Sequence, residues 1–164
     1  MKLEKETLSY IFKMLSTDFE HYFKDINFKS SYLGVFSADN YPKELQTFNF
    51  FIVNKDTSSE KGSHWMLVML GEKDIEFFDS CGTNSQFVKT FLKFKKQYFC
   101  MYNKTPLQPM NSETCGEFCV YFAHERINNL DKSFFKTLNK YFTHDLNRNN
   151  ERVLRACNKI FQQQ

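Results

Sequence analysis

Polar residues that suit nucleophilic catalysis stand at three separate points of the chain. His64 opens an apolar run, Asp79 comes near the end of the next run, and Cys115 lies in the motif TCGEFC. A thiol nucleophile needs a base to take its proton, and an imidazole base needs a carboxylate that fixes its tautomer and stabilises its cation. These residue types in these contexts indicate acyl transfer through a thioester.

Cys115 lies where a helix is expected to begin. Thr114 and Glu117 fit the S/T-x-x-E capping box, which makes Thr114 the N-cap and Cys115 the first helical residue. Unpaired backbone N–H groups and the helix dipole favour a thiolate there. Gly116 leaves room for a substrate backbone beside the sulfur. We therefore predict that Cys115 is the nucleophile, whereas Cys119 is interpreted as a buried apolar residue.

A predicted β-hairpin brings His64 and Asp79 together. Its two strand-like runs, HWMLVML and IEFFDS, are joined by the short connection GEKD. If Leu70 faces Ile75, His64 stands opposite Cys81, and Asp79 is within diagonal reach of the imidazole. If the register is shifted so that residue 69 faces residue 74, His64 and Asp79 are directly opposite. Both registers predict the contact; the alternative is an aspartate that only ends a strand at a turn.

Gln108 precedes Cys115 by seven residues in a polar loop. Its side-chain amide is a neutral donor for the oxygen that becomes negative when a thiolate attacks a carbonyl carbon. The backbone N–H of Cys115 is a second donor for the same oxygen. The alternative is an ordinary surface glutamine.

The pattern GSHW…FFDS…LQPMNSETCGEFC resembles the adenain-like family, the maturation cysteine proteases of adenoviruses, virophages and Polinton-type elements. It is more distantly similar to the SUMO and ubiquitin-like-protein proteases. The spacing of Gln108 and Cys115 is that of adenain, whereas Asp79 stands where adenain has Glu and the SUMO proteases have Asp. The resemblance covers roughly residues 31–127.

Specific roles follow from the resemblance. It implies that Cys115 is the nucleophile, His64 the general base and acid, Asp79 the residue that orients His64, and Gln108 the oxyanion donor. Trp65 would form a wall of the substrate cleft, with Gly116 on the other side of a slot that accepts small residues.

The resemblance also implies a biological role. We expect a viral cysteine endopeptidase that cleaves capsid and core precursors at small-residue, glycine-containing sites during virion maturation. It would act as a monomer in the host cytoplasm or nucleus, at the assembly site, and inside the virion. The chemistry needs no cofactor, but relatives are assisted by DNA and by a peptide that joins the sheet, sometimes through a disulfide. We interpret Cys100 as a buried strand cysteine rather than as that partner.

Two other functions remain open at this point. One is a deconjugating protease that acts on a ubiquitin-like or SUMO modifier. The other is a capsid or nucleic-acid-binding protein without enzymatic activity on the same fold. The complete set of four catalytic residue types argues against the second.

Basic residues gather in two places where DNA could bind. Net charge is only +3, well short of a dedicated DNA-binding protein. The alternative for each group is a solvated helix face. The first group lies on a predicted helix over residues 85–99 and the second near the C-terminus; their members are Lys89, Lys93 and Lys96, then Arg148, Arg152 and Arg155.

Composition predicts a single globular domain. The chain has 164 residues, of which 41% are hydrophobic and 25% charged, so that disordered and low-complexity classes are excluded. No apolar window reaches the roughly 18 residues of a membrane span, and no secretory signal is visible. Five cysteines, an odd number, indicate free thiols in a reducing compartment. The sequence has no CxxC or HxxxH motif and therefore predicts no zinc site.

The elements that must position these residues predict an α+β domain. We expect a small, mainly antiparallel central sheet flanked by helices, with the catalytic cysteine at a helix N-terminus. The single domain 1–164 divides into a catalytic core of about 31–127 and a C-terminal helical segment of about 131–164. Residues 30–42 are expected to be irregular. Strands are predicted over 48–54, 64–70, 75–80 and 99–103, and helices over 3–15, from Thr17, over 85–99, and from 115 with breaks near 128–131 and 143–149.

Overall fold

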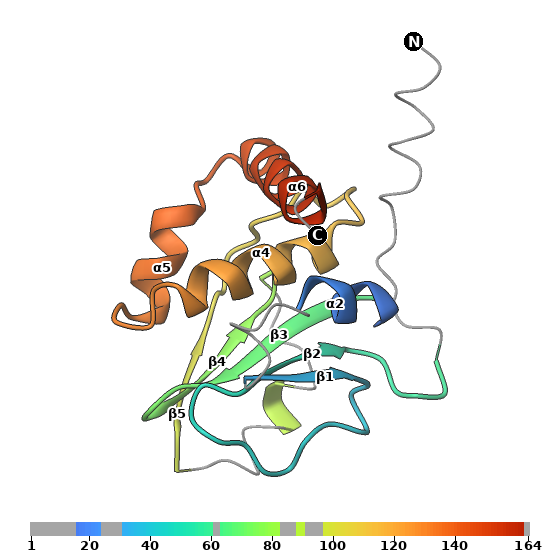
Figure 1. Ribbon diagram of the computed structural model, residues 1–164, viewed down its shortest axis with the longest axis vertical. Helices are drawn as coiled ribbons and strands as arrows, with labels where there is room; N and C mark the ends of the chain where they lie inside the picture. Colours follow the sequence, from blue (N-terminus) through green and yellow to red (C-terminus); the bar gives the residue numbers. More distant parts are fainter. Residues whose placement is uncertain (1–15, 24–30, 61–62, 83–87, 91–96, 163–164) are drawn as a thin grey trace.

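A five-stranded sheet forms the middle of the protein (Figure 1). The computed structural model describes residues 16–23, 31–60, 63–82, 88–90 and 97–162. The strands are β1 (Tyr32–Phe36), β2 (Phe50–Asn54), β3 (Trp65–Leu70), β4 (Asp74–Phe78) and β5 (Phe99–Tyr102), and the helices are α2 (Ser16–Tyr22), α4 (Cys115–Ile127), α5 (Phe134–Tyr141) and α6 (Leu146–Gln162). The predicted fold class, a sheet flanked by helices, is therefore confirmed.

The order of the strands across the sheet is their order along the chain, β1-β2-β3-β4-β5. The two central pairings, β2–β3 and β3–β4, are antiparallel, whereas the outer pairings β1–β2 and β4–β5 are parallel. The expectation of a mainly antiparallel sheet was wrong at both edges. Each outer pair is joined by a long connection that returns the chain to the same end of the sheet, as parallel pairing requires.

The hairpin of β3 and β4 has the predicted register. Leu70 pairs with Ile75, and Leu67 pairs with Phe78. His64 immediately precedes β3 and Asp79 immediately follows β4, so that both stand at the open end of the hairpin. A short connection between the strands thus fixes the separation of two potential catalytic groups.

Strand β1 lies where irregular structure was expected. Gly34 adopts φ +122°, a backbone conformation that other residues rarely take, and the pairing with β2 shifts register between Tyr32 and Val35. The glycine therefore marks a bulge within a strand rather than its end. A strand forms despite Gly34 because the residues on either side of it favour β-structure and the edge of β2 lies beside them.

Both faces of the sheet are covered, which explains why every residue of β2 is buried. Phe50 and Ile52 face the helices, and Phe51 and Val53 face the opposite layer. On the helical side, phenylalanine rings fill the space between sheet and helices. The rings of Phe78 and Phe122, for example, stack with centroids 4.3 Å apart. This packing uses part of the unusually large phenylalanine content of the sequence.

The predicted C-terminal helices are confirmed, with one boundary corrected. The second break was placed at 143–149, but α6 already begins at Leu146. Thr17, the expected N-cap of the second helix, lies inside α2 instead. The predicted helix 3–15 and most of helix 85–99 lie outside the described residues, although 88–90 are helical. No helix among the described residues is long and apolar enough to cross a membrane.

Candidate active site

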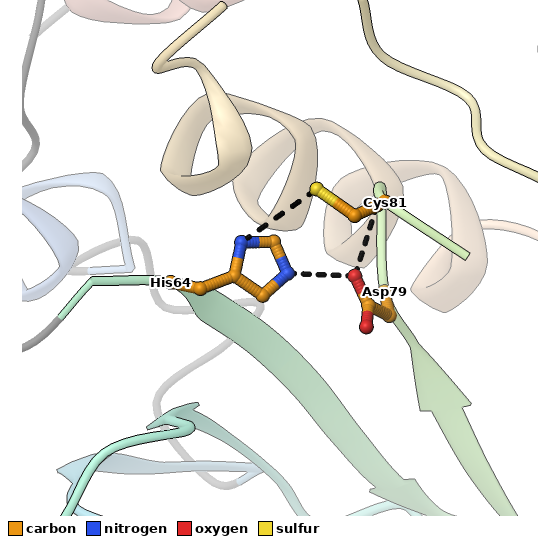
Figure 2. A group of neighbouring side chains, drawn as sticks. All are labelled: His64, Asp79 and Cys81. Carbon is orange, nitrogen blue, oxygen red and sulfur yellow. Dashed lines mark hydrogen bonds and ion pairs between the residues drawn. The ribbon is translucent and has the colours of Figure 1, made fainter. Parts of the chain in front are cut away.

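His64 and Asp79 form a buried pair at the open end of the hairpin. The imidazole Nε2 lies 2.6 Å from the Asp79 Oδ1, and both side chains are almost entirely removed from solvent (Figure 2). The same carboxylate oxygen accepts a 2.9 Å hydrogen bond from the backbone N–H of Cys81. The predicted contact between histidine and aspartate is therefore present. It leaves the other ring nitrogen, Nδ1, for a different partner.

Nδ1 of His64 faces sulfur. The Cys81 Sγ lies 3.9 Å from it (Figure 2), and the Cys115 thiol also hydrogen-bonds to the His64 side chain. Burial by itself would lower the pKa of His64. The hydrogen bonds to Asp79, Cys115 and Cys81, with the negative charge of Asp79, outweigh burial and raise the pKa to about 12. The ring thus lies between the carboxylate of Asp79 and the thiols of Cys81 and Cys115.

Cys115 is the first residue of α4, as predicted, but the cap is built differently. Thr114 occupies the N-cap position without a side-chain bond to the helix backbone. Its hydroxyl donates instead to the Oδ1 of Asn150 in α6, at 2.6 Å. The capping box therefore predicted the start of the helix correctly, but the predicted hydrogen bond from the helix backbone to the Thr114 side chain is not formed.

Glu117 lies in the same first turn and is buried. Burial, with a smaller contribution from Asp18, raises the pKa of Glu117 to about 7, and the Glu117 Oε2 has no hydrogen-bond partner among the described residues.

Gln108 is buried and held at both ends of its amide. Its Oε1 accepts a hydrogen bond from the fully buried hydroxyl of Ser80. Its Nε2 lies 3.1 Å from both the carbonyl oxygen and the Oγ of Ser112. The side chain is therefore oriented by partners on the turn after β4 and on the loop before α4, and it is not a surface glutamine.

The turn that follows β4 is anchored from several sides. Asn103, buried just after β5, accepts a hydrogen bond from the Asp79 N–H at 3.0 Å and donates its side-chain amide to the Asp79 carbonyl. Gly82 has φ +65°, and a Cβ there would lie 2.4 Å from the backbone of Thr105. Asp79, Ser80 and Cys81 are thus carried by a turn whose backbone has little freedom to move.

The two predicted cleft residues have different surroundings. Trp65 is half-buried, and its ring packs edge-on against Phe19 of α2 with centroids 5.2 Å apart. Gly116 is buried in the first turn of α4. A substrate-binding role for either residue stays a prediction.

The predicted basic groups are only partly described. Lys93 and Lys96 lie outside the described residues, and Lys89 lies in the helical segment 88–90. The arginines of α6 line a hollow of about 530 Å³, but two acidic residues line it as well. Two of these arginines also have protein partners, since Arg152 donates to the Tyr141 carbonyl and Arg155 lies 3.9 Å from Glu151.

Several residues that shape this site were not predicted from the sequence. Serine and asparagine are common in loops and turns, so neither Ser80 nor Asn103 carries a motif signal. Cys81 was placed opposite His64 by the register, but no function was attached to it. Cys100 is half-buried, as a strand cysteine would be, and burial raises its pKa to about 11.

The chain has limited similarity to known proteins. No family model and no curated protein matches the chain. Among solved structures, the chain is similar to the crystal structure of the ASFV pS273R protease, with 22% identity and a TM-score of 0.44. The similarity covers 64% of this chain and 41% of that one, so that the chain spans less than half the length of that protein.

Proposed function

We propose that this chain is a cysteine endopeptidase. The observation that carries the proposal is the placement of His64 between a buried carboxylate and the thiol at the first position of α4. Aspartate, imidazole and thiol in this order are the arrangement that activates a sulfur nucleophile. Metal-free acyl transfer needs no group beyond these and an oxyanion site.

The proposed reaction follows from the positions of these groups. Cys115 attacks the substrate carbonyl as a thiolate, and the His64 cation then gives its proton to the leaving amine. A thioester to Cys115 remains. His64, now neutral, takes a proton from a water molecule whose oxygen attacks the thioester carbonyl. The carbon–sulfur bond then breaks, which releases the acid product and restores the Cys115 thiolate beside the His64 cation. Asp79 keeps the imidazole oriented throughout through its bond to Nε2.

Oxyanion stabilisation would come from the backbone N–H of Cys115 and the amide of Gln108. Both contacts of the Gln108 Nε2 are with Ser112, and the serine hydroxyl already donates to the Pro109 carbonyl. We therefore expect the developing oxyanion to replace the Ser112 Oγ as the acceptor of one Gln108 N–H. Such a donor typically contributes about 10²–10³ in kcat.

As substrates we propose capsid and core precursors of a virus or virus-like element, cut at glycine-containing sites. The support is the adenain-like pattern around His64, Asp79 and Cys115 and the glycine that follows the nucleophile. The second candidate is a deconjugating protease for a ubiquitin-like modifier, favoured by aspartate rather than glutamate at position 79. The bond that is cut distinguishes the two candidates. Cleavage of a linear precursor would favour the first, and cleavage of an isopeptide bond would favour the second.

The decisive experiment combines cleavage and labelling. The full chain would be incubated with a glycine-containing peptide library and with a thiol-reactive peptide analogue, beside Cys115→Ala and the matched control Cys100→Ala. We expect cleavage and labelling to be lost only in Cys115→Ala. Retained cleavage by that variant would exclude the mechanism, and an unlabelled, inactive wild type would favour the non-enzymatic alternative.

DNA assistance is part of the proposal and has its own test. Four basic residues of α6 face the same hollow, against two acidic ones: Arg148, Arg152, Arg155 and Lys159, with Glu125 and Glu151. Peptide cleavage would be measured with and without DNA at low and at physiological salt, since phosphate contacts weaken steeply as salt rises. A rate indifferent to DNA in both conditions, with no binding, would identify these residues as solvated surface.

A further inference from the structure

Cys81 is a thiol at the candidate active site that the peptidase mechanism does not use. Its Sγ lies 3.9 Å from the His64 Nδ1, and one potential ligand atom from each of His64, Asp79 and Cys81 lies within 4.8 Å of the other two. Figure 2 shows the sulfur and the carboxylate at different nitrogens of the imidazole ring. Sulfur, nitrogen and oxygen donors so close together are the donor set of a transition-metal site.

The distances suit a tetrahedral cation. In a zinc site the nitrogen lies about 2.0–2.1 Å and the sulfur about 2.3 Å from the metal, which places the two donors about 3.6 Å apart. The Cys81 Sγ and the His64 Nδ1 are only slightly farther apart than this. A small rotation of the Cys81 side chain would therefore complete the geometry without movement of the backbone.

A third donor lies beside the same ring. The thiol of Cys115 hydrogen-bonds to the His64 side chain. Asp79 stays on Nε2, 2.6 Å away, where it would orient the imidazole and increase its basicity as carboxylates do behind metal-bound histidines. Two sulfurs, one nitrogen and a water molecule make a four-coordinate set that favours Zn²⁺ over Mg²⁺ or Ca²⁺.

The turn that carries Cys81 is suited to holding a ligand in place. Its backbone N–H donates to the Asp79 Oδ1, and the next N–H, that of Gly82, donates to the Asp79 carbonyl at 2.8 Å. Cys81 is half-buried rather than enclosed. The backbone that carries the Cys81 sulfur is thus held in place beside His64.

We propose that Cys81 Sγ, His64 Nδ1 and Cys115 Sγ form an inhibitory binding site for Zn²⁺, with Asp79 behind the histidine. The metal displaces the proton on Nδ1 and any proton on the two sulfurs, and no bond in the protein is broken. Because it occupies both the nucleophile and the base, it stops peptide cleavage until it is removed. The inhibition rests on the proposed function, whereas the binding itself does not.

Binding is tested without any assay of activity. Chelator-stripped protein, kept reduced, would be titrated with Co²⁺, and absorbance would report thiolate-to-cobalt charge transfer; Zn²⁺ affinity would come from competition with a chromophoric chelator. We expect Cys81→Ala to weaken Zn²⁺ binding by at least about 100-fold, and Asp79→Asn by about 10–100-fold. The half-buried Cys100 supplies the matched control, and Cys100→Ala should bind as the wild type does. Equal affinity in Cys81→Ala and Cys100→Ala would overturn the proposal.

Inhibition is then measured on each variant against its own metal-free rate. Zn²⁺ should inhibit wild type and Cys100→Ala at the same concentration, Cys81→Ala only at a concentration at least about 10-fold higher, and Mg²⁺ should inhibit none of them. Zinc binding through Cys81 in a protein without peptidase activity would contradict the proposed function alone. Peptidase activity whose zinc sensitivity does not depend on Cys81 would contradict the metal site alone.

Discussion

The side-chain amide of Asn149 donates a 3.0 Å hydrogen bond to the carbonyl oxygen of Leu107, forty-two residues earlier in the chain. The next residue, Asn150, accepts a hydrogen bond from the hydroxyl of Thr114. Two consecutive asparagines of α6 therefore hold the two ends of the loop 107–114. This loop carries Gln108 and leads into Cys115, so the C-terminal helical segment is a structural part of the candidate site.

Asn149→Ala should impair both stability and catalysis. Asn149 is fully buried, and its loss leaves the Leu107 carbonyl without this partner, at a cost of about 1–3 kcal/mol in the free energy of unfolding. Because the loop positions Gln108, the proposed oxyanion donor, kcat should fall more than KM rises. Urea unfolding and peptide kinetics would measure both effects. The exposed Asn147, replaced by alanine, is the control; an unchanged kcat in Asn149→Ala would separate α6 from the site.

Ser80→Ala should lower kcat through Gln108. The buried hydroxyl of Ser80 is the donor to the Gln108 Oε1, so without it the amide loses its fixed orientation. We expect Gln108→Ala to reduce kcat by about 10²–10³ and Ser80→Ala to reduce it less. In a double-mutant cycle, Ser80→Ala should have almost no further effect once Gln108 is alanine. Additive losses would show that Ser80 acts by another route.

The His64 ion pair should stabilise the fold most at low pH. Its pKa is raised from 6.5 to about 12, so the folded state binds the proton more tightly than the unfolded state. The resulting stabilisation is complete below about pH 6.5 and declines as the pH rises toward 12, by up to about 1.4 kcal/mol per pH unit. Urea unfolding would compare wild type with His64→Gln, both in chelator. The difference between their free energies of unfolding should be smaller at pH 9 than at pH 6. A difference that grows with pH would contradict the assigned direction of the pKa shift.

Glu117→Gln should make the protein more stable at alkaline pH. Burial raises the pKa of Glu117 from 4.5 to about 7, so ionisation of this carboxyl opposes folding. The sign is again that of a raised pKa: stability is lost as the pH rises from about 4.5 through 7. Glutamine has the same shape without the charge, and the variant should exceed wild type by more than about 1 kcal/mol at pH 8. Near pH 4.5 the two free energies of unfolding should converge, and a constant difference would exclude the explanation.

The hairpin shows how far local sequence information reaches. The contact between His64 and Asp79 was predictable because the GEKD connection and the alternation of the two strands fix a register over a short stretch of chain. The first helical position of Cys115 was predictable for the same reason, since caps are local signals. The bond of Thr114 was not, because its actual acceptor, Asn150, lies on a different helix. Asparagine and serine side chains acquire such roles only when distant elements meet, and no pattern along the chain reports that.

The order of the strands also has a consequence for synthesis on the ribosome. Each strand of the sheet pairs with the strand made just before it, so the sheet can be extended strand by strand while the chain emerges. The candidate catalytic groups appear in the same direction, from His64 to Cys115, whereas Asn149 and Asn150, which hold the loop 107–114, are made last. A nascent chain would thus carry a finished sheet and Cys115 before the loop 107–114 is held. On the proposed function, peptide cleavage would begin only after α6 has left the exit tunnel.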